Sequence, residues 1–172
     1  MPLVILTLIV PCLCADAARC ITDPNLVDYK GYFRHVETSC HKSTVKAYYI
    51  HRSSNDVTAR DKDWGKSFNE NNIHEGILEF FSARKGETKS VVSAALHSLE
   101  PIMKFFEVQK SFQFYASSLL FVYESDLSKA ISMRVILIDF SHAFSTNGEG
   151  DDGYLFGLKN LHTILSRLAV QD

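Results

Sequence analysis

Two apolar stretches, QFYASSLLFVYE at Gln113–Glu124 and MRVILIDF at Met133–Phe140, decide the fold of this chain. Both are short and rich in the aromatic and β-branched residues that strands favour. The second stretch is apolar on both faces, which predicts a buried strand. Asp139 stands at its carboxyl end, where sheets present groups to ligands. A carboxylate buried there would need a partner or a metal ion. The alternative is an Asp that caps the turn Ser141-His142.

Helical periodicity flanks these stretches along the chain. Asn69 or Asn71 can cap a helix near residues 70–84, and a second helix is expected near 89–107, where Pro101 should kink or split it. A last helix follows the acidic loop Asn147–Gly153. The apolar faces of the helices are formed by Ile73, Ile77, Leu78, Phe80 and Phe81; by Val92, Leu96, Leu99, Met103 and Phe106; and by Leu158, Leu161, Leu165 and Leu168. With an alternating strand at Thr44–Ile50, the pattern predicts an α+β fold in which helices pack on a small, mainly antiparallel sheet.

Composition excludes several classes of protein. The chain has 172 residues, of which 46% are hydrophobic, and 18 basic residues stand against 20 acidic ones. This length suits one domain or two small lobes, and the high apolar content argues against disorder. A formal net charge of −2 argues against a general nucleic-acid binder, which would be basic. The four cysteines form neither a C-x-x-C pair nor a zinc-binding pattern.

The first 22 residues form an atypical segment. Leu3–Val10 is apolar, and Ala15-Asp16-Ala17 resembles a signal-peptidase site. Eight residues are too few to span a membrane. The alternatives are a secretory signal over residues 1–17, a buried strand, or an artefact of the gene model. A signal would make the protein secreted, and otherwise we expect it in the cytoplasm, the nucleus or both.

A locally basic stretch runs from Lys30 to Arg52. It carries Lys30, Arg34, Lys42, Lys46 and Arg52 with three histidines, against the single acid Glu37. Such a concentration suits a multiply phosphorylated small molecule, and a solvated charged face is the alternative. The loop Gly148–Gly153 matches G-x-G-x-x-G, but its three carboxylates would repel a pyrophosphate. We expect Asp151 or Asp152 to lie at the amino end of the last helix instead.

Four segments together resemble the inositol polyphosphate kinases, a family that includes the multikinases and the hexakisphosphate kinases. DKDWGKSFNENNIHEGILEFF from Asp61 is similar to the family's aromatic-Gly-basic-Ser stretch and the helix after it. Ser117–Leu120 resembles the S-S-L-L strand, and Val135–His142 (VILIDFSH) the I-D-F-A-H segment. Asp151–Leu161 (DDGYLFGLKNL) is similar to the closing D-x-G-Y-x-x-G-L helix.

The resemblance implies a two-lobed, protein-kinase-like fold and transfer of the ATP γ-phosphate to an inositol phosphate hydroxyl. Residues 23–172 would form its C-lobe, lacking most of the N-lobe, because only 23 residues without a lysine precede Pro24. The cofactors implied are ATP and magnesium. Asp139 matches the magnesium-binding residue, and Ser117 and Ser118 match serines that support the cofactor site.

The family motif P-x-x-x-D-x-K-x-G is partly present at Pro24–Gly31, where the glycine falls one place early. By resemblance Asp28 is the catalytic acid–base group and Lys30 holds a substrate phosphate. From the basic stretch we expect Lys42, Lys46 and Arg52 to take part in substrate binding. Two functions stay open at this stage: an inositol polyphosphate kinase, or a non-catalytic, pseudokinase-like module that binds inositol phosphates or a protein. We expect a monomer.

Overall fold

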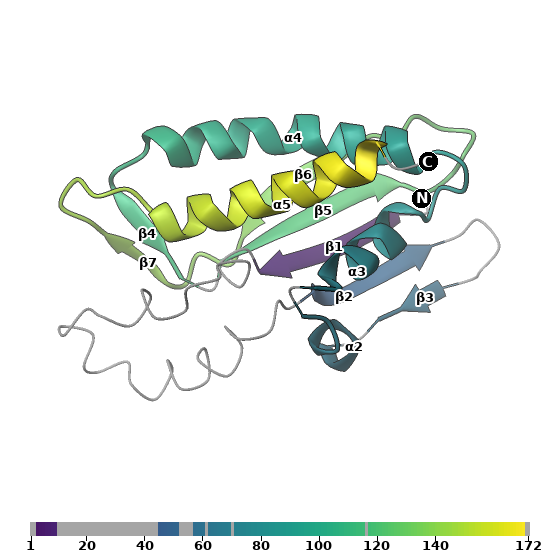
Figure 1. Cartoon of the computed structure of the whole chain (residues 1–172), viewed down its shortest axis with the longest axis horizontal. Helices are drawn as coiled ribbons and strands as arrows, with labels where there is room; N and C mark the ends of the chain where they lie inside the picture. The colour runs from purple at the N-terminus through teal and green to yellow at the C-terminus, as the bar shows by residue number, and fades with distance from the viewer. Residues whose placement is uncertain are drawn as a thin grey trace.

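The computed structural model describes the backbone of residues 3–9, 45–51, 57–60, 62–69, 71–115 and 117–170. A five-stranded antiparallel sheet has the order β3-β2-β1-β5-β6, and a smaller sheet pairs β4 with β7 (Figure 1). The strands are β1 (Leu3–Ile9), β2 (Val45–His51), β3 (Val57–Ala59), β4 (Phe112–Phe114), β5 (Ser118–Glu124), β6 (Arg134–Ile138) and β7 (Ala143–Ser145). The helices are α2 (Lys62–Lys66), α3 (Ile73–Phe81), α4 (Thr88–Val108) and α5 (Asp152–Val170). The expected α+β fold is confirmed.

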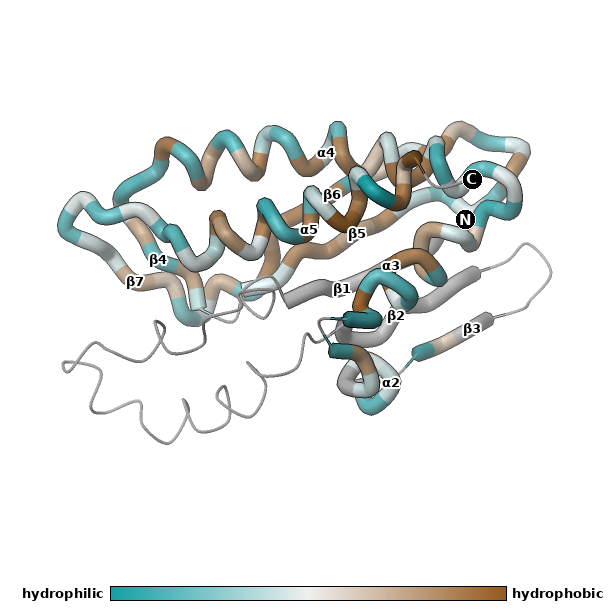
Figure 2. Tube along the Cα trace, in the orientation of Figure 1, coloured by the Kyte–Doolittle hydropathy of each residue, from teal (hydrophilic) through white to brown (hydrophobic). Residues whose placement is uncertain are grey.

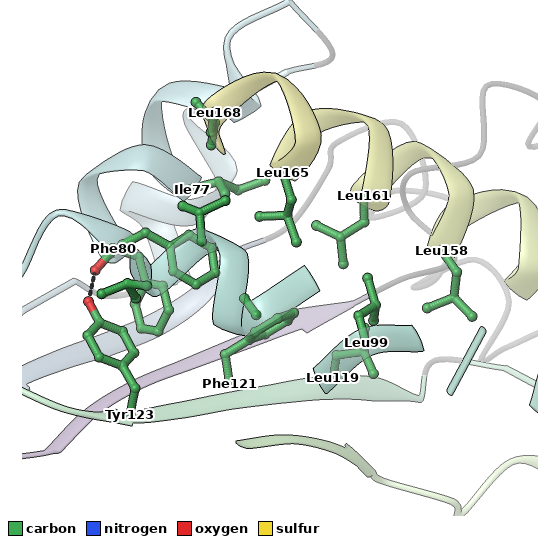
Figure 3. Close-up of a cluster of buried hydrophobic side chains, with 14 of the residues drawn as sticks. Ile77, Phe80, Leu99, Leu119, Phe121, Tyr123, Leu158, Leu161, Leu165 and Leu168 are labelled. Carbon is green, nitrogen blue, oxygen red and sulfur yellow. Dashed lines mark hydrogen bonds between the residues drawn. The ribbon is translucent and has the colours of Figure 1, made fainter. Parts of the chain in front are cut away.

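Strand β5 carries the sheet's contribution to the core. Its alternate residues Leu119, Phe121 and Tyr123 are fully buried, as the two-residue period of a strand requires. They face α3, α4 and α5, which lie together on this side of the large sheet (Figures 1 and 3). The Tyr123 hydroxyl donates a hydrogen bond to the Phe80 carbonyl of α3, so this phenol is buried with its polar atom satisfied.

The three long helices follow the predicted apolar stripes. Hydrophobic and hydrophilic residues alternate along α4 and α5 in Figure 2, with the period that places one face on the sheet. The leucines of α5 point into the core beside Leu99 of α4 (Figure 3). One detail differs from the prediction, because α3 begins at Ile73 with Asn72 before it rather than Asn69 or Asn71.

Pro101 does not split α4, which runs unbroken from Thr88 to Val108. Both Pro101 and His97, four residues earlier, are exposed. The His97 carbonyl therefore loses its helical partner where water can replace it, which is why a helix tolerates a proline on its solvent side.

Two strand predictions were wrong in detail. Gln113–Glu124 is not one strand, since β4 pairs with β7 and β5 belongs to the large sheet. The predicted buried strand is β6, which forms an edge of the large sheet, and its Ile136 is 43% exposed. Only β5 pairs with β6 within the described residues, and Val135 and Leu137 are the β6 residues that pack against the core. An apolar run alone does not reveal whether both of its faces are covered.

The apolar N-terminal residues form a strand. Leu3–Ile9 is β1, which lies between β2 and β5 and is antiparallel to both. The strand is thus present, while the secretory signal and the gene-model artefact stay predictions. In the part of the chain that the structure describes, no helix is both long enough and apolar enough to cross a membrane.

A buried arginine joins the helices to the β5–β6 hairpin. Arg84, between α3 and α4, donates to the carbonyls of Glu124, Asp126 and Lys129 at 3.1, 2.7 and 3.0 Å. It also forms an ion pair with Glu87 at 2.7 Å. The guanidinium thus uses its several donors to hold the hairpin turn, which compensates for its burial.

Asp151 joins the start of α5 to β4 by hydrogen bonds. Its Oδ1 accepts a hydrogen bond from the Tyr154 backbone N–H at 2.9 Å, as an N-cap does, and its Oδ2 accepts one from the Phe114 N–H of β4 at 2.7 Å. Burial nevertheless raises the pKa of the Asp151 carboxyl above its usual value. The expected helix-terminal role is therefore filled by Asp151, and Asp152 is exposed.

We predict that Asp151→Ala destabilises the chain by about 2 kcal/mol, because two backbone N–H groups lose their acceptor. Asp152→Ala is the matched control, and its effect should stay within about 0.5 kcal/mol. Urea unfolding followed by circular dichroism measures both. Equal effects of the two substitutions would contradict the role given to Asp151.

Candidate active site around Asp139

Asp139 has an unusual backbone conformation directly after β6. Its φ is 64°, in the left-handed region that Asp tolerates better than most residues other than Gly. The Ser117 hydroxyl donates a hydrogen bond to the Asp139 carbonyl at 2.9 Å. Ser117 is fully buried, so its hydroxyl is shielded from water, and the bond as a whole is partly buried. The bond therefore stabilises the left-handed backbone conformation of Asp139.

The strand register brings these two residues together. Ser118 of β5 pairs with Ile138 of β6 on one side and with Ile9 of β1 on the other. Ser117 and Asp139, one residue beyond this row, are consequently neighbours at the end of the sheet. The sequence predicted both residues as site residues without predicting that they touch.

The Asp139 side chain is exposed, contrary to the expectation of a buried carboxylate. The reason is that β6 lies at the edge of the sheet, so its carboxyl end opens to solvent. Oδ1 accepts a hydrogen bond from the Ser141 hydroxyl at 2.9 Å, and among the described residues Oδ2 has no partner. The contact with Ser141 is that of the turn-capping alternative, and it leaves one oxygen for a ligand.

This donor set fits a cation that arrives with a nucleotide. Among the described residues, no three His, Cys, Asp or Glu side chains gather into a metal-binding group. Magnesium in phosphoryl-transfer sites is held by one or two carboxylates and by the substrate's own phosphates, with water filling the other positions. An exposed carboxylate oxygen at the end of a sheet satisfies that requirement.

The other predicted site residues are placed only in part. Asp28, Lys30, Lys42 and Arg52 lie outside the described residues. Lys46 belongs to β2, where its backbone pairs with Thr7 of β1. Both β1 at its last residue and β2 at its first lie at the Asp139 end of the sheet, because Ile9 pairs with Ser118 and Val45 with Leu8.

Of the two predicted cofactor-binding serines, the structure gives Ser117 a positioning contact. The Ser118 side chain is also buried, and its hydroxyl forms no hydrogen bond to the described residues. A direct contact of either serine with a nucleotide stays a prediction.

Ser141 and His142 complete the turn and were not predicted as site residues. The Ser141 Oγ lies 3.1 Å from the His142 Nδ1. A Ser two residues after an Asp is a common turn pattern, which the sequence contains. The pattern alone does not tell which oxygen of Asp139 the serine engages.

Comparison with known proteins places the chain in a family. The family model described as inositol polyphosphate kinase matches residues 29–166. The chain belongs to the inositol polyphosphate kinase family. Human inositol polyphosphate multikinase is 30% identical over 125 residues, which is 73% of this chain and 29% of the human protein. The Schizosaccharomyces pombe multikinase is 31% identical over 119 residues, covering 64% of this chain and 43% of its relative. The chain thus spans less than half the length of either relative.

A solved structure confirms the kinase-like fold. The crystal structure of the inositol phosphate multikinase Ipk2 from S. cerevisiae, in complex with ADP and Mn²⁺, superposes with a TM-score of 0.69 at 17% sequence identity. The match covers 96% of this chain and 78% of the yeast chain. This chain therefore shares its fold with a solved inositol phosphate multikinase.

We predict that Ser117→Ala speeds hydrogen exchange of the backbone amides at residues 139–142 and destabilises the chain by about 1–2 kcal/mol, because the positive-φ turn loses its hydrogen bond from the buried Ser117 hydroxyl. Ser118→Ala is the matched control, since it removes a buried hydroxyl without that bond. Exchange mass spectrometry reports on the turn. Similar exchange in both variants would show that Ser117 does not hold Asp139.

Proposed function

We propose that this chain transfers the γ-phosphate of ATP to a hydroxyl of an inositol polyphosphate. Membership of the family supports the reaction class. The observation that carries the proposal for this chain is Asp139, whose backbone is fixed by the buried Ser117 hydroxyl while its carboxylate stays exposed. Catalysis of phosphoryl transfer consists largely of positioning and charge neutralisation, and a carboxylate on a fixed turn suits that task.

In this proposal Asp139 holds the magnesium ion of the nucleotide. Bound there, magnesium supplies neutralisation of the charge on the phosphate oxygens. Asp28 orients the attacking hydroxyl and accepts its proton, and Lys30 holds a phosphate of the substrate. Ser117 acts through Asp139, by keeping its backbone in place.

The basic stretch is proposed as the region that binds the substrate's phosphates. Lys30 and Lys42 lie in the segment between β1 and β2, and Lys46 is the second residue of β2. This segment starts from and returns to the end of the sheet at which Asp139 lies. Lys30 and Lys42 are therefore connected to the correct end of the molecule for a phosphorylated substrate, whereas Arg52 follows His51, the last residue of β2, at the opposite end of the sheet.

We predict that Asp139→Asn lowers turnover by a factor on the order of 10³ or more, because the amide keeps the shape of the side chain but loses the charge that holds the cation. Phosphate transfer from γ-labelled ATP to a panel of inositol polyphosphates measures the effect. A thermal melt of the same variant should stay close to that of the unsubstituted chain, since Asp139 is exposed.

Asp152→Asn is the matched control, because it neutralises another exposed carboxylate outside the turn. A folded Asp139→Asn variant with unchanged turnover would refute the metal assignment. Binding of inositol phosphates with no turnover in the unsubstituted chain would favour the non-catalytic binding module.

We predict that inositol hexakisphosphate raises the melting temperature of the chain, and that reversing two charges with Lys30→Glu and Lys46→Glu abolishes this rise. Added salt should weaken the stabilisation by screening. Lys159→Glu, on the exposed side of α5, is the control and should leave the rise intact. Stabilisation that survives the double substitution would place the phosphate site elsewhere.

A further inference from the structure

The side chains of Asp139, Ser141 and His142 form a hydrogen-bonded row on the turn after β6. The Ser141 hydroxyl lies 2.9 Å from Oδ1 of Asp139, and its oxygen lies 3.1 Å from Nδ1 of His142. Asp139 and Ser141 are exposed, and His142 is half-buried. The row therefore links the candidate metal ligand to a side chain that is partly packed into the turn.

The direction of the hydrogen bonds in this row follows from proton counting. A serine hydroxyl has one hydrogen to donate and lone pairs to accept with. The ionised carboxylate of Asp139 is the stronger acceptor, so the hydroxyl hydrogen is directed to Oδ1. Ser141 then has only lone pairs to offer His142, and the imidazole must donate from Nδ1.

We propose that Ser141 is a positioning residue for Asp139: supported by the Nδ1–H of His142, it occupies one carboxylate oxygen and leaves Oδ2 to bind the cation of a metal–nucleotide complex. This inference rests on the proposed function and specifies how Asp139 performs it. Occupation of Oδ1 restricts Asp139 to a single rotamer and to coordination through one oxygen. A hydrogen-bonded carboxylate ligand is held ready for the cation, so less side-chain freedom is lost on binding.

The role differs from a purely structural one. Ser141 is exposed, so removal of its hydroxyl leaves no buried group without a partner and should change the melting temperature little. Its loss should instead change how well Asp139 binds a cation. Partners that orient metal ligands typically contribute 10–100-fold to metal affinity.

The first test determines which nitrogen of His142 carries the proton. With ¹⁵N-labelled histidine, long-range ¹H–¹⁵N spectra should show His142 protonated at Nδ1. Ser141→Ala should reduce the population of this tautomer. A His142 protonated at Nε2 in the unsubstituted chain would overturn the proposed row, whatever the chain's activity.

The second test measures cation binding without catalysis. With Mn²⁺ and ADP as the probe, electron paramagnetic resonance gives the fraction of bound Mn²⁺. Ser141→Ala should weaken Mn²⁺ binding about tenfold. Ser141→Thr retains a hydroxyl and should restore the affinity of the unsubstituted chain. Both variants should melt at nearly the same temperature.

The outcomes separate this inference from the proposed function. If Asp139→Asn abolishes Mn²⁺ binding while Ser141→Ala does not weaken it, the positioning role is wrong and the metal assignment stands. If the unsubstituted chain and Asp139→Asn bind Mn²⁺ alike, or neither binds it, the metal assignment fails and the role of Ser141 fails with it.

Discussion

The register between β5 and β6 is the constraint on which the rest of the site depends. Leu119, Phe121 and Tyr123 of β5 are fully buried under the helices, and a slip of one residue would turn all three toward the opposite face. Burial of large side chains of this kind is worth roughly 1.5–3 kcal/mol each, so such a slip is strongly disfavoured. The register thus fixed places Ser118 opposite Ile138, and it is for this reason that the Ser117 hydroxyl meets the Asp139 carbonyl.

Polar contacts hold the two ends of this hairpin. At the turn between the strands, buried Arg84 binds three backbone carbonyls; at the opposite end, the buried Ser117 hydroxyl binds one. Asp151 forms a further contact of this kind, because it joins the start of α5 to β4. In each case a buried polar side chain forms hydrogen bonds with backbone groups of another element or of a connecting turn. Such bonds are needed because backbone groups next to an apolar core have little access to water. The turn that carries the candidate site is consequently attached to a hairpin that is fixed at both ends.

The helices and strands that depend on local periodicity could be predicted from the sequence. The helices around Ile77, Leu99 and Leu165 and the strand at Val45–His51 follow from their patterns, and the family motifs pointed to Asp139. The edge position of β6 was not predictable, because an apolar run does not specify what covers its second face. The break between β4 and β5 depends on pairing with β7, a partner distant in sequence. The positive φ of Asp139 and the contacts of Arg84 arise from tertiary packing, which no local pattern contains.

The topology of the sheet also bears on the partial motif that contains Asp28 and Lys30. On its own, an Asp and a Lys two residues apart identify no site. The motif occurs, however, between Ile9 and Val45, and both of these residues belong to the end of the sheet that carries Asp139. The segment between β1 and β2 begins and ends at this end of the sheet. In the proposed function, it is therefore the segment from which the base Asp28 and the phosphate-binding Lys30 would approach a nucleotide held by Asp139. The order of the strands, more than the match of the motif, therefore supports the proposal that the two residues act at the same site as Asp139.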